Sequence, residues 1–319
     1  MSHAGIFTAP VSDVLASATS VLVAGAGGGF DVCAGLPLYF TLLRLRKEVT
    51  LANLSFTHLP GTSAEQIGEA LFRVTADTIG QRQYSPEKYL AEWLSAHHYA
   101  GEIYCFPKTG GRPLRDAYAA LAAERRIDAV VLVDGGTDIV MRGDEAGLGT
   151  PAEDMVSLSA ASALAVPIKI VSCLGFGIDA YHGVCHAHFL ENVAALSAAG
   201  GYLGTHSLHL DMPEVALFRD AVEHVHARMP DRPSIVNSSI LSALEGQFGN
   251  VHRTDRTSAS RLFINPLMSM YWHFDLAAVA ARSLYLPRLA ETETLLDVQV
   301  EIDEFVRSVT PRERQPIPV

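Results

Sequence analysis

Short apolar runs alternate with amphipathic stretches along most of this 319-residue chain. A short apolar run fits a strand buried on both faces, and an amphipathic stretch fits a helix that covers the sheet. Their alternation is typical of βαβ units and a mainly parallel sheet. No repeat, low-complexity tract or linker divides the chain. The sequence therefore predicts an α/β fold, a Rossmann-like three-layer sandwich, in a single domain over residues 1–319.

The expected elements follow from where the apolar runs stop at glycine, proline or charged residues. Strands are expected at 21–24, 48–54, 102–106, 129–133, 167–172, 202–203 and 234–237. Helices are expected at 31–46, 113–125, 151–164, 183–198, 213–228 and 295–309. Residues 57–100 predict a helical excursion over the sheet edge, and residues 263–310 predict a C-terminal helical segment.

Composition limits the classes of partner. The formal net charge of −11 argues against a broad nucleic-acid surface, because phosphate neutralisation needs a basic face. A small anion is still compatible, since backbone amides and a few arginines bind it locally. The N-terminus lacks the features of a signal peptide, and no apolar stretch is long enough to span a bilayer. We expect a cytoplasmic protein with four reduced cysteines and no membrane partner; a homo-oligomer is compatible with the sequence.

A glycine-rich turn, Gly25-Ala-Gly-Gly-Gly29, follows the first predicted strand. Backbone N–H groups at such a turn can approach phosphate or carboxylate oxygens. The dinucleotide fingerprint needs a third glycine where this chain has Phe30, and an acidic residue where it has Asn53. The turn therefore predicts an anion site rather than a conventional NAD site, with a tight turn that binds no ligand as the alternative. The candidate ligand-binding residues here are Gly27, Gly28, Gly29 and Asp31.

An acidic loop follows the strand predicted at 129–133. It reads Asp134-Gly-Gly-Thr-Asp138 and continues into Arg142-Gly-Asp-Glu145. Open α/β sheets place their sites at such strand ends. Carboxylates there can bind ribose hydroxyls, chelate Mg²⁺ or Ca²⁺, or act as a general base; a solvated loop rich in turns is the alternative. Asp134 and Asp138 are candidate catalytic residues, and Thr137, Asp144 and Glu145 are candidate ligand-binding residues.

Histidines and basic residues near other strand ends add further candidates. His182 and His186 are spaced to share one face at the start of a predicted helix, and are candidate acid/base catalysts. A zinc site is the alternative, although HExxH is absent. Lys108 and Arg112 follow the strand at 102–106 and can neutralise an anion on the glycine turn; a polar loop that caps a helix is the alternative.

Two nucleophile candidates have weaker support. Cys33 follows the glycine turn, where the helix dipole would lower the thiol pKa, although such a cysteine is more often simply buried. Ser238 and Ser239 lack the GxSxG elbow of serine hydrolases.

Seven segments carry a resemblance to a known family. They are VLVAGAGGGFDVCAGLPLY (21–39), EVTLANLSF (48–56), FPKTGGRPLRDAY (106–118), VVLVDGGTDIVMRGDEAGLGTPAEDM (130–155), FLENVA (189–194), NSSILSALEGQFG (237–249) and SRLFINPLMSMYWHFDL (260–276). Together they resemble domain of unknown function 1152, which is found in bacteria and archaea. The resemblance implies one continuous domain and no particular activity.

The strand-end candidates together predict an enzyme that acts on a nucleotide, a nucleoside or another phosphorylated small molecule by hydrolysis or group transfer. The anionic group is expected on the glycine turn with Lys108 or Arg112. Asp134 or Asp138 would bind sugar hydroxyls or serve as base, with His182 or His186 as acid/base partner. No cofactor follows from the sequence, and a divalent metal stays open. The alternatives are an NAD(P)-dependent oxidoreductase and a non-catalytic nucleotide sensor.

Overall fold

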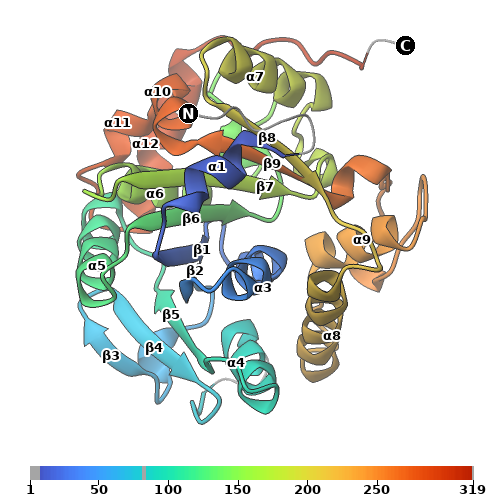
Figure 1. Ribbon diagram of the computed structural model, residues 1–319. Coiled ribbons are helices and arrows are strands. Elements are labelled where there is room, and N and C mark those ends of the chain that lie inside the picture. The colour runs from blue at the N-terminus through green and yellow to red at the C-terminus, as the bar shows by residue number, and fades with distance from the viewer. Residues whose placement is uncertain (1–7, 81–83, 318–319) are drawn as a thin grey trace.

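A nine-stranded sheet forms the centre of the computed structural model, which describes residues 8–80 and 84–317 (Figure 1). The strand order is β3-β4-β5-β2-β1-β6-β7-β9-β8. Helices cover the sheet on both faces, so the expected α/β class is confirmed.

Five central strands run parallel to one another. They are β1 (Ser20–Gly25), β2 (Glu48–Leu54), β5 (Glu102–Phe106), β6 (Ala129–Asp134) and β7 (Ile168–Leu174). β1 and β6 are buried along their whole length, as expected for apolar strands between two helical layers. From β1 the chain moves outward to β2 and β5, and it then returns to the other side of β1 to form β6 and β7. In open α/β sheets, ligands bind beside such a change of direction.

Antiparallel strands complete both sides of the sheet. The hairpin of β3 (Glu65–Gly68) and β4 (Leu71–Thr75) pairs with β5, while β9 (Met270–Asp275) lies between β7 and β8 (Tyr202–Ser207). The structure thus differs from the helical excursion expected at 57–100, of which α4 (Pro86–Ala96) is the helical part. Leu71, Phe72 and Val74 are buried, which explains why this segment joins the sheet. Likewise, the aromatic run at 271–274 forms a strand inside the expected C-terminal helical segment.

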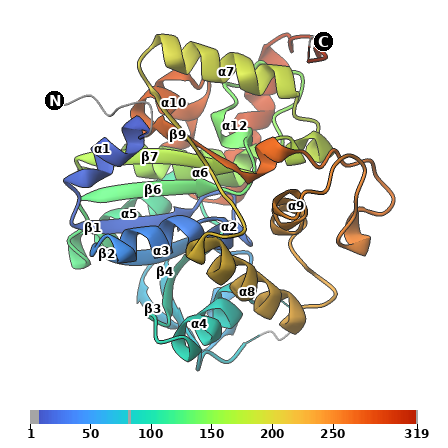
Figure 2. The same cartoon turned by 45° about the vertical axis from the view of Figure 1, so that its right-hand side comes forward.

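Two helical layers flank the sheet, as Figures 1 and 2 show. One layer contains α1 (Pro10–Ala16), α2 (Asp31–Ala34), α3 (Leu36–Arg44), α4, α8 (Pro213–Arg228) and α9 (Ile235–Leu244). The other contains α5 (Gly111–Glu124), α6 (Pro151–Ser162), α7 (His186–Ala198), α10 (Leu276–Arg282), α11 (Leu286–Leu289) and α12 (Leu295–Ser308). Short 3₁₀ helices η1 (Leu59–Gly61), η2 (Asp138–Val140), η3 (Ile178–His182), η4 (Asp255–Thr257) and η5 (Pro266–Ser269) lie in the loops. In the described part of the chain, no helix has both the length and the apolar character needed to cross a membrane.

One further expected element is wrong, and another begins later than expected. The strand expected at 234–237 is the start of α9, where the Ser234 side chain caps the helix by accepting the N–H of Asn237 at 3.1 Å. The single helix expected at 183–198 begins only at His186, because Gly183 adopts a left-handed conformation with φ 95°. His182 belongs to η3, so the two histidines do not share a helix face.

Candidate functional site

Five buried aspartates gather at the carboxyl ends of β1, β6 and β7. They are Asp31 at the start of α2, Asp134 at the end of β6, Asp138 in η2, Asp154 in the first turn of α6 and Asp179 in η3. The register brings the first two together, since Gly25 of β1 lies beside Val133 of β6 and the N–H of Ala26 donates to the carbonyl of Val133 at 2.8 Å. The glycine turn and the acidic loop thus face the same region.

Three of these carboxylates are close enough to share one ion. Asp31, Asp134 and Asp154 each place an oxygen within 4.8 Å of the oxygens of the other two. The side chain of Asp154 is almost completely buried, since the residue is 1% exposed. Its Oδ1 has no hydrogen-bond partner. A buried unpartnered carboxylate oxygen is costly unless something else binds it. Carboxylate oxygens are the ligands that hard divalent cations prefer, and the set fits such an ion.

Glycines let the backbone approach these carboxylates closely. A Cβ added at Gly27 would lie 2.6 Å from Asp154 Oδ1 and 2.9 Å from Asp31 Oδ2. At Gly135 it would lie 2.6 Å from Asp31 Oδ1, and at Gly136 2.6 Å from Asp179 Oδ1. Gly135 and Gly136 therefore play the same steric role as Gly27: a side chain at any of the three positions would clash with a carboxylate of the cluster.

Backbone amides and threonine hydroxyls hold the carboxylates in place. The N–H of Gly27 donates to Asp31 Oδ2 at 2.6 Å. Thr137 donates its N–H and its hydroxyl to Asp179 Oδ2 at 2.5 and 3.1 Å. Thr150 does the same for Asp138 Oδ2 at 2.7 and 3.2 Å. Thr137, expected to bind ligand, here orients a carboxylate of the cluster.

Burial raises the pKa of the clustered aspartates. The pKa of Asp31 rises to about 7, because burial and then the charge of Asp138 outweigh the hydrogen bonds from the backbone. Burial, followed by the charges of neighbouring aspartates, raises the pKa of Asp134 and of Asp154 well above the usual range. Without a cation, the cluster therefore retains protons at neutral pH. A bound cation would displace them.

A cleft of about 440 Å³ opens beside the glycine turn. Its lining residues are Gly28, Gly29, Phe30, Asp31, Phe56, Tyr84, Arg232, Ser234, Ile235, Val236 and Arg256. Arg232 lies in the connection between α8 and α9, and Arg256 lies in η4, where it donates to the carbonyl of Pro233 at 2.7 Å. Two arginines and one carboxylate of the acidic cluster, Asp31, thus line the same cleft.

An exposed aromatic ring forms part of the cleft wall. Phe56 is 41% exposed, and a Cβ at Gly28 would meet its ring at 2.3 Å. Lys108 Nζ lies 3.8 Å from the centre of the same ring and pairs with Glu153 at 3.0 Å. Lys108 and the glycine turn thus lie against the same aromatic ring.

Arg112 lies apart from this region. Its Nε donates to Glu293 at 2.5 Å, and its guanidinium also pairs with Asp116 at 3.6 Å. Arg112 therefore joins α5 to the segment before α12.

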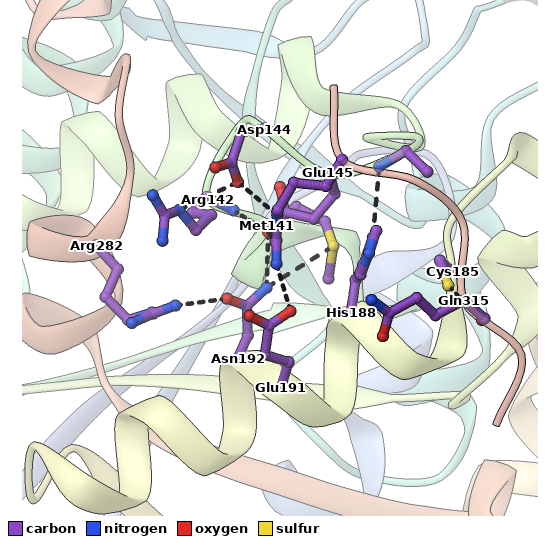
Figure 3. Close-up of polar contacts among 12 residues, drawn as sticks. Met141, Arg142, Asp144, Glu145, Cys185, His188, Glu191, Asn192, Arg282 and Gln315 are labelled. Atoms are coloured by element: carbon purple, nitrogen blue, oxygen red, sulfur yellow. Dashed lines mark hydrogen bonds and ion pairs between the residues drawn. The ribbon is translucent and has the colours of Figure 1, made fainter. Parts of the chain in front are cut away.

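Asp144 and Glu145 belong to a separate polar cluster (Figure 3). Glu145 accepts the N–H of Arg142 at 2.9 Å and the side-chain amide of Asn192 at 2.9 Å. Arg312 Nε pairs with Asp144 at 3.1 Å. These contacts connect the loop after η2 with α7 and the C-terminal segment.

The histidines differ in their surroundings. The pKa of Asp138 is raised by burial, while the hydrogen bonds from Thr150 and the charge of His182 oppose that rise, so exposed His182 lies within electrostatic reach of the cluster. His186 packs edge-on against Phe176 at 5.3 Å, and burial lowers its pKa. Its Nε2 is buried without a hydrogen-bond partner.

Cys33 and Ser239, two of the nucleophile candidates, are not activated. All four cysteines are free and buried, as expected for reduced thiols. Burial raises the pKa of Cys33, so the lowering expected from a helix dipole is wrong. Ser239 lies within α9, where its hydroxyl donates to the carbonyl of Ile235 at 2.9 Å.

Comparison with known proteins places the chain in a family. The family model described as protein of unknown function (DUF1152) matches residues 22–308. The chain belongs to this family. The resemblance seen in the sequence is thereby confirmed, and the match spans the acidic cluster and the cleft. No curated protein and no solved structure matches the chain.

Several residues of the site in this DUF1152 member did not emerge from the sequence, and two acidic and two basic ones carry the most charge. Asp154 and Asp179 lie in the first turns that follow the acidic loop and β7, and acidic residues at such positions were the available signal. Arg232 and Arg256 lie about 200 residues from the glycine turn, and no local pattern connects them with it.

Proposed function

We propose that this chain is a divalent-cation-dependent enzyme that acts on a phosphorylated small molecule by hydrolysis or group transfer. One observation carries the proposal. The buried, unpartnered Oδ1 of Asp154 belongs to three carboxylates whose oxygens lie within 4.8 Å, beside a cleft that holds two arginines. The order of the five parallel strands also supports a Rossmann-like variant of the α/β fold, with the site at its switch point.

Asp31, Asp134 and Asp154 would hold the cation. Mg²⁺ fits this role, because it is commonly bound by a few carboxylates together with substrate phosphate oxygens. A cation here would supply charge neutralisation of the phosphoryl oxygens and activation of water. Asp138 and Asp179 are held by threonine donors. They would not contact the cation, but their negative charges would help to neutralise it.

The residues that line the cleft are the reason for proposing a phosphorylated substrate. A phosphate would meet Arg232, Arg256 and the backbone of Gly28 and Gly29 on its way to the cluster. Phe56, which is 41% exposed in the cleft wall, offers aromatic contact to a nucleobase at the part of its ring that Lys108 and the glycine turn leave uncovered, which favours a nucleotide over a bare phosphorylated sugar. His182, near Asp138, is the proposed acid/base group.

A dinucleotide reading has less support. Asn53 stands where dinucleotide sites carry an acidic residue. It is fully buried, and its amide donates to the Gly29 carbonyl at 2.9 Å and to Glu87 at 2.8 Å. That side chain is committed to holding the glycine turn.

Calorimetric titration with Mg²⁺ and Mn²⁺ tests the proposal, followed by assays of phosphate release from nucleoside phosphates in the presence of the bound ion. Wild type and an Asp116→Asn control, changed at an exposed carboxylate outside the site, should bind one ion. Asp154→Asn should lose that binding. Equal ion affinity in Asp154→Asn and wild type would refute the assignment. Ion binding without turnover of any phosphorylated substrate would leave a sensor in place of an enzyme.

A further inference from the structure

A second cavity, of about 400 Å³, lies between α1, α3 and the segment that joins β8 to α8. Its walls are mainly apolar, and their larger side chains are Val11, Leu15, Leu38, Leu42, Leu208 and Met212. Protein interiors contain few voids larger than a water molecule. An apolar pocket of this size is therefore a candidate ligand site rather than a packing defect.

A chain of polar side chains forms its floor. Ser172 Oγ lies 2.8 Å from His273 Nδ1, and His273 Nε2 lies 3.2 Å from His206 Nδ1. Ser172 and His273 face each other across β7 and β9 and are 0% and 1% exposed. Burying three polar side chains under apolar walls costs free energy unless they form hydrogen bonds. Here they satisfy one another except at the His206 end of the chain.

Both imidazole rings are neutral at neutral pH. Burial, and then the charge of His206, lowers the pKa of His273 to about 3. Burial also lowers the pKa of His206. Each neutral ring carries one N–H, so the chain runs either from the serine toward His206 or in reverse. In the first case His206 Nε2 donates outward, and in the second it accepts.

The charged groups at the rim are already paired. Arg44 binds Glu214 at 2.8 Å, and Lys47 Nζ donates to the carbonyls of Ala16 and Ala18 at 3.0 and 2.5 Å. An anionic ligand would have to compete for these cations, whereas a neutral ligand would leave them undisturbed. The cavity therefore suits an uncharged molecule.

The floor is built for binding rather than hydrolysis. Ser172 lies inside β7, paired with Val133 on one side and His273 on the other. The neighbouring backbone N–H groups belong to the sheet ladder, so no pair of donors remains to stabilise an oxyanion at this hydroxyl.

We infer that the cavity under α1 and α3 binds a neutral, largely apolar small molecule with a single carbonyl or hydroxyl group, which hydrogen-bonds to His206. The site is separate from the acidic cluster. Its occupancy requires neither a divalent cation nor a phosphorylated substrate, so the two proposals stand or fall independently.

The solvatochromic dye 6-propionyl-2-(dimethylamino)naphthalene is a suitable probe, because it is neutral and apolar and carries one carbonyl. Wild type should bind it saturably, one dye per chain, with blue-shifted emission that EDTA and Asp154→Asn leave unchanged. Leu38→Trp, which fills the cavity, should weaken binding at least tenfold. His206→Phe should weaken it several-fold in a protein that remains folded, with a lower Tm because the buried His273 loses its partner.

Leu217→Trp is the matched control, since this leucine lies on α8 outside the cavity lining. Should Leu38→Trp fail to fold, Ser12→Trp at the exposed rim blocks the same opening. Absence of saturable binding to wild type would overturn the inference. Equal affinity of wild type and the folded cavity-filling variant would overturn it as well, and unchanged binding to His206→Phe would remove the proposed hydrogen bond.

Discussion

The backbone N–H of Gly27 donates to Oδ2 of Asp31 at 2.6 Å, so the glycine turn binds a carboxylate of its own chain. An anion-binding turn attracts anions whereas an acidic cluster repels them and attracts cations, and this contact joins the two into one unit. The turn holds Asp31 in place, and the remaining glycines, Gly28 and Gly29, line the neighbouring cleft. A divalent cation between carboxylates and phosphate reconciles the two features.

Cation binding should stabilise the folded protein, since the ion binds preferentially to the assembled cluster. At a concentration a hundred times the dissociation constant, the gain is about 2.7 kcal/mol. Thermal denaturation of wild type should show a rise in Tm with Mg²⁺ or Mn²⁺, and Asp154→Asn should abolish it. Asp116→Asn should keep the full rise. A cation-dependent Tm in Asp154→Asn equal to that of wild type would contradict the prediction.

Without a bound cation, the contribution of Asp31 to the free energy of unfolding should fall as pH rises. The folded-state pKa of Asp31, about 7, exceeds its unfolded value near 4, so its contribution is present at low pH and is lost as pH rises through 7. Without a cation, Asp31→Asn should therefore gain Tm relative to wild type as pH increases from about 5 to 8. Saturating Mg²⁺ should reverse that advantage. Because His273 has a lowered pKa and acts in the opposite direction, the comparison is made between the two proteins at each pH. A difference in Tm that does not vary with pH would exclude the raised pKa.

Gly27→Ala should damage the site without touching the rest of the sheet. The added methyl group would lie 2.6 Å from Asp154 Oδ1, so the carboxylate or the turn must shift. We expect a loss of about 1–3 kcal/mol in unfolding free energy, together with weaker cation binding. Gly68→Ala is the control, since its Cβ would meet its nearest neighbour, the Leu71 side chain, at 3.3 Å. Urea denaturation and Mn²⁺ titration measure the two effects; normal ion affinity in Gly27→Ala would show that close approach at this glycine is dispensable.

Arg232→Ala should weaken anion binding and leave cation binding intact. A hydrogen bond to a charged group contributes about 1.5–3 kcal/mol, so the affinity for a nucleoside monophosphate should fall roughly tenfold to a hundredfold. Arg112→Ala should bind as wild type does, because this guanidinium pairs with Glu293 and does not line the cleft. Titration with the nucleotide in the presence of Mg²⁺ distinguishes them. If Arg112→Ala lost affinity and Arg232→Ala did not, the cleft would be the wrong site.

The central strands were predictable because their burial on both faces produces continuous apolar runs, as in β1 and β6. The hairpin of β3 and β4 was not, since a short edge strand is polar on one side and resembles a loop. The segment at 234–237 contains β-branched residues, yet the Ser234 cap and the apolar continuation make it a helix. Local propensity could not separate these outcomes.

The candidate site was predictable in part for the same reason. Asp134 ends a buried strand and Asp31 follows a glycine turn, so both could be placed at the strand ends from local pattern alone. Glu145 follows the same loop, but its partner Asn192 on α7 turns it toward a structural cluster. Arg256 reaches the cleft through tertiary packing, and a single sequence carries no trace of that contact.

The most direct measurement is anomalous diffraction from crystals grown with Mn²⁺. The account predicts one strong anomalous peak within coordination distance of Asp31, Asp134 and Asp154, and its disappearance in Asp154→Asn. A saturated crystal with no peak between these three carboxylates would contradict it.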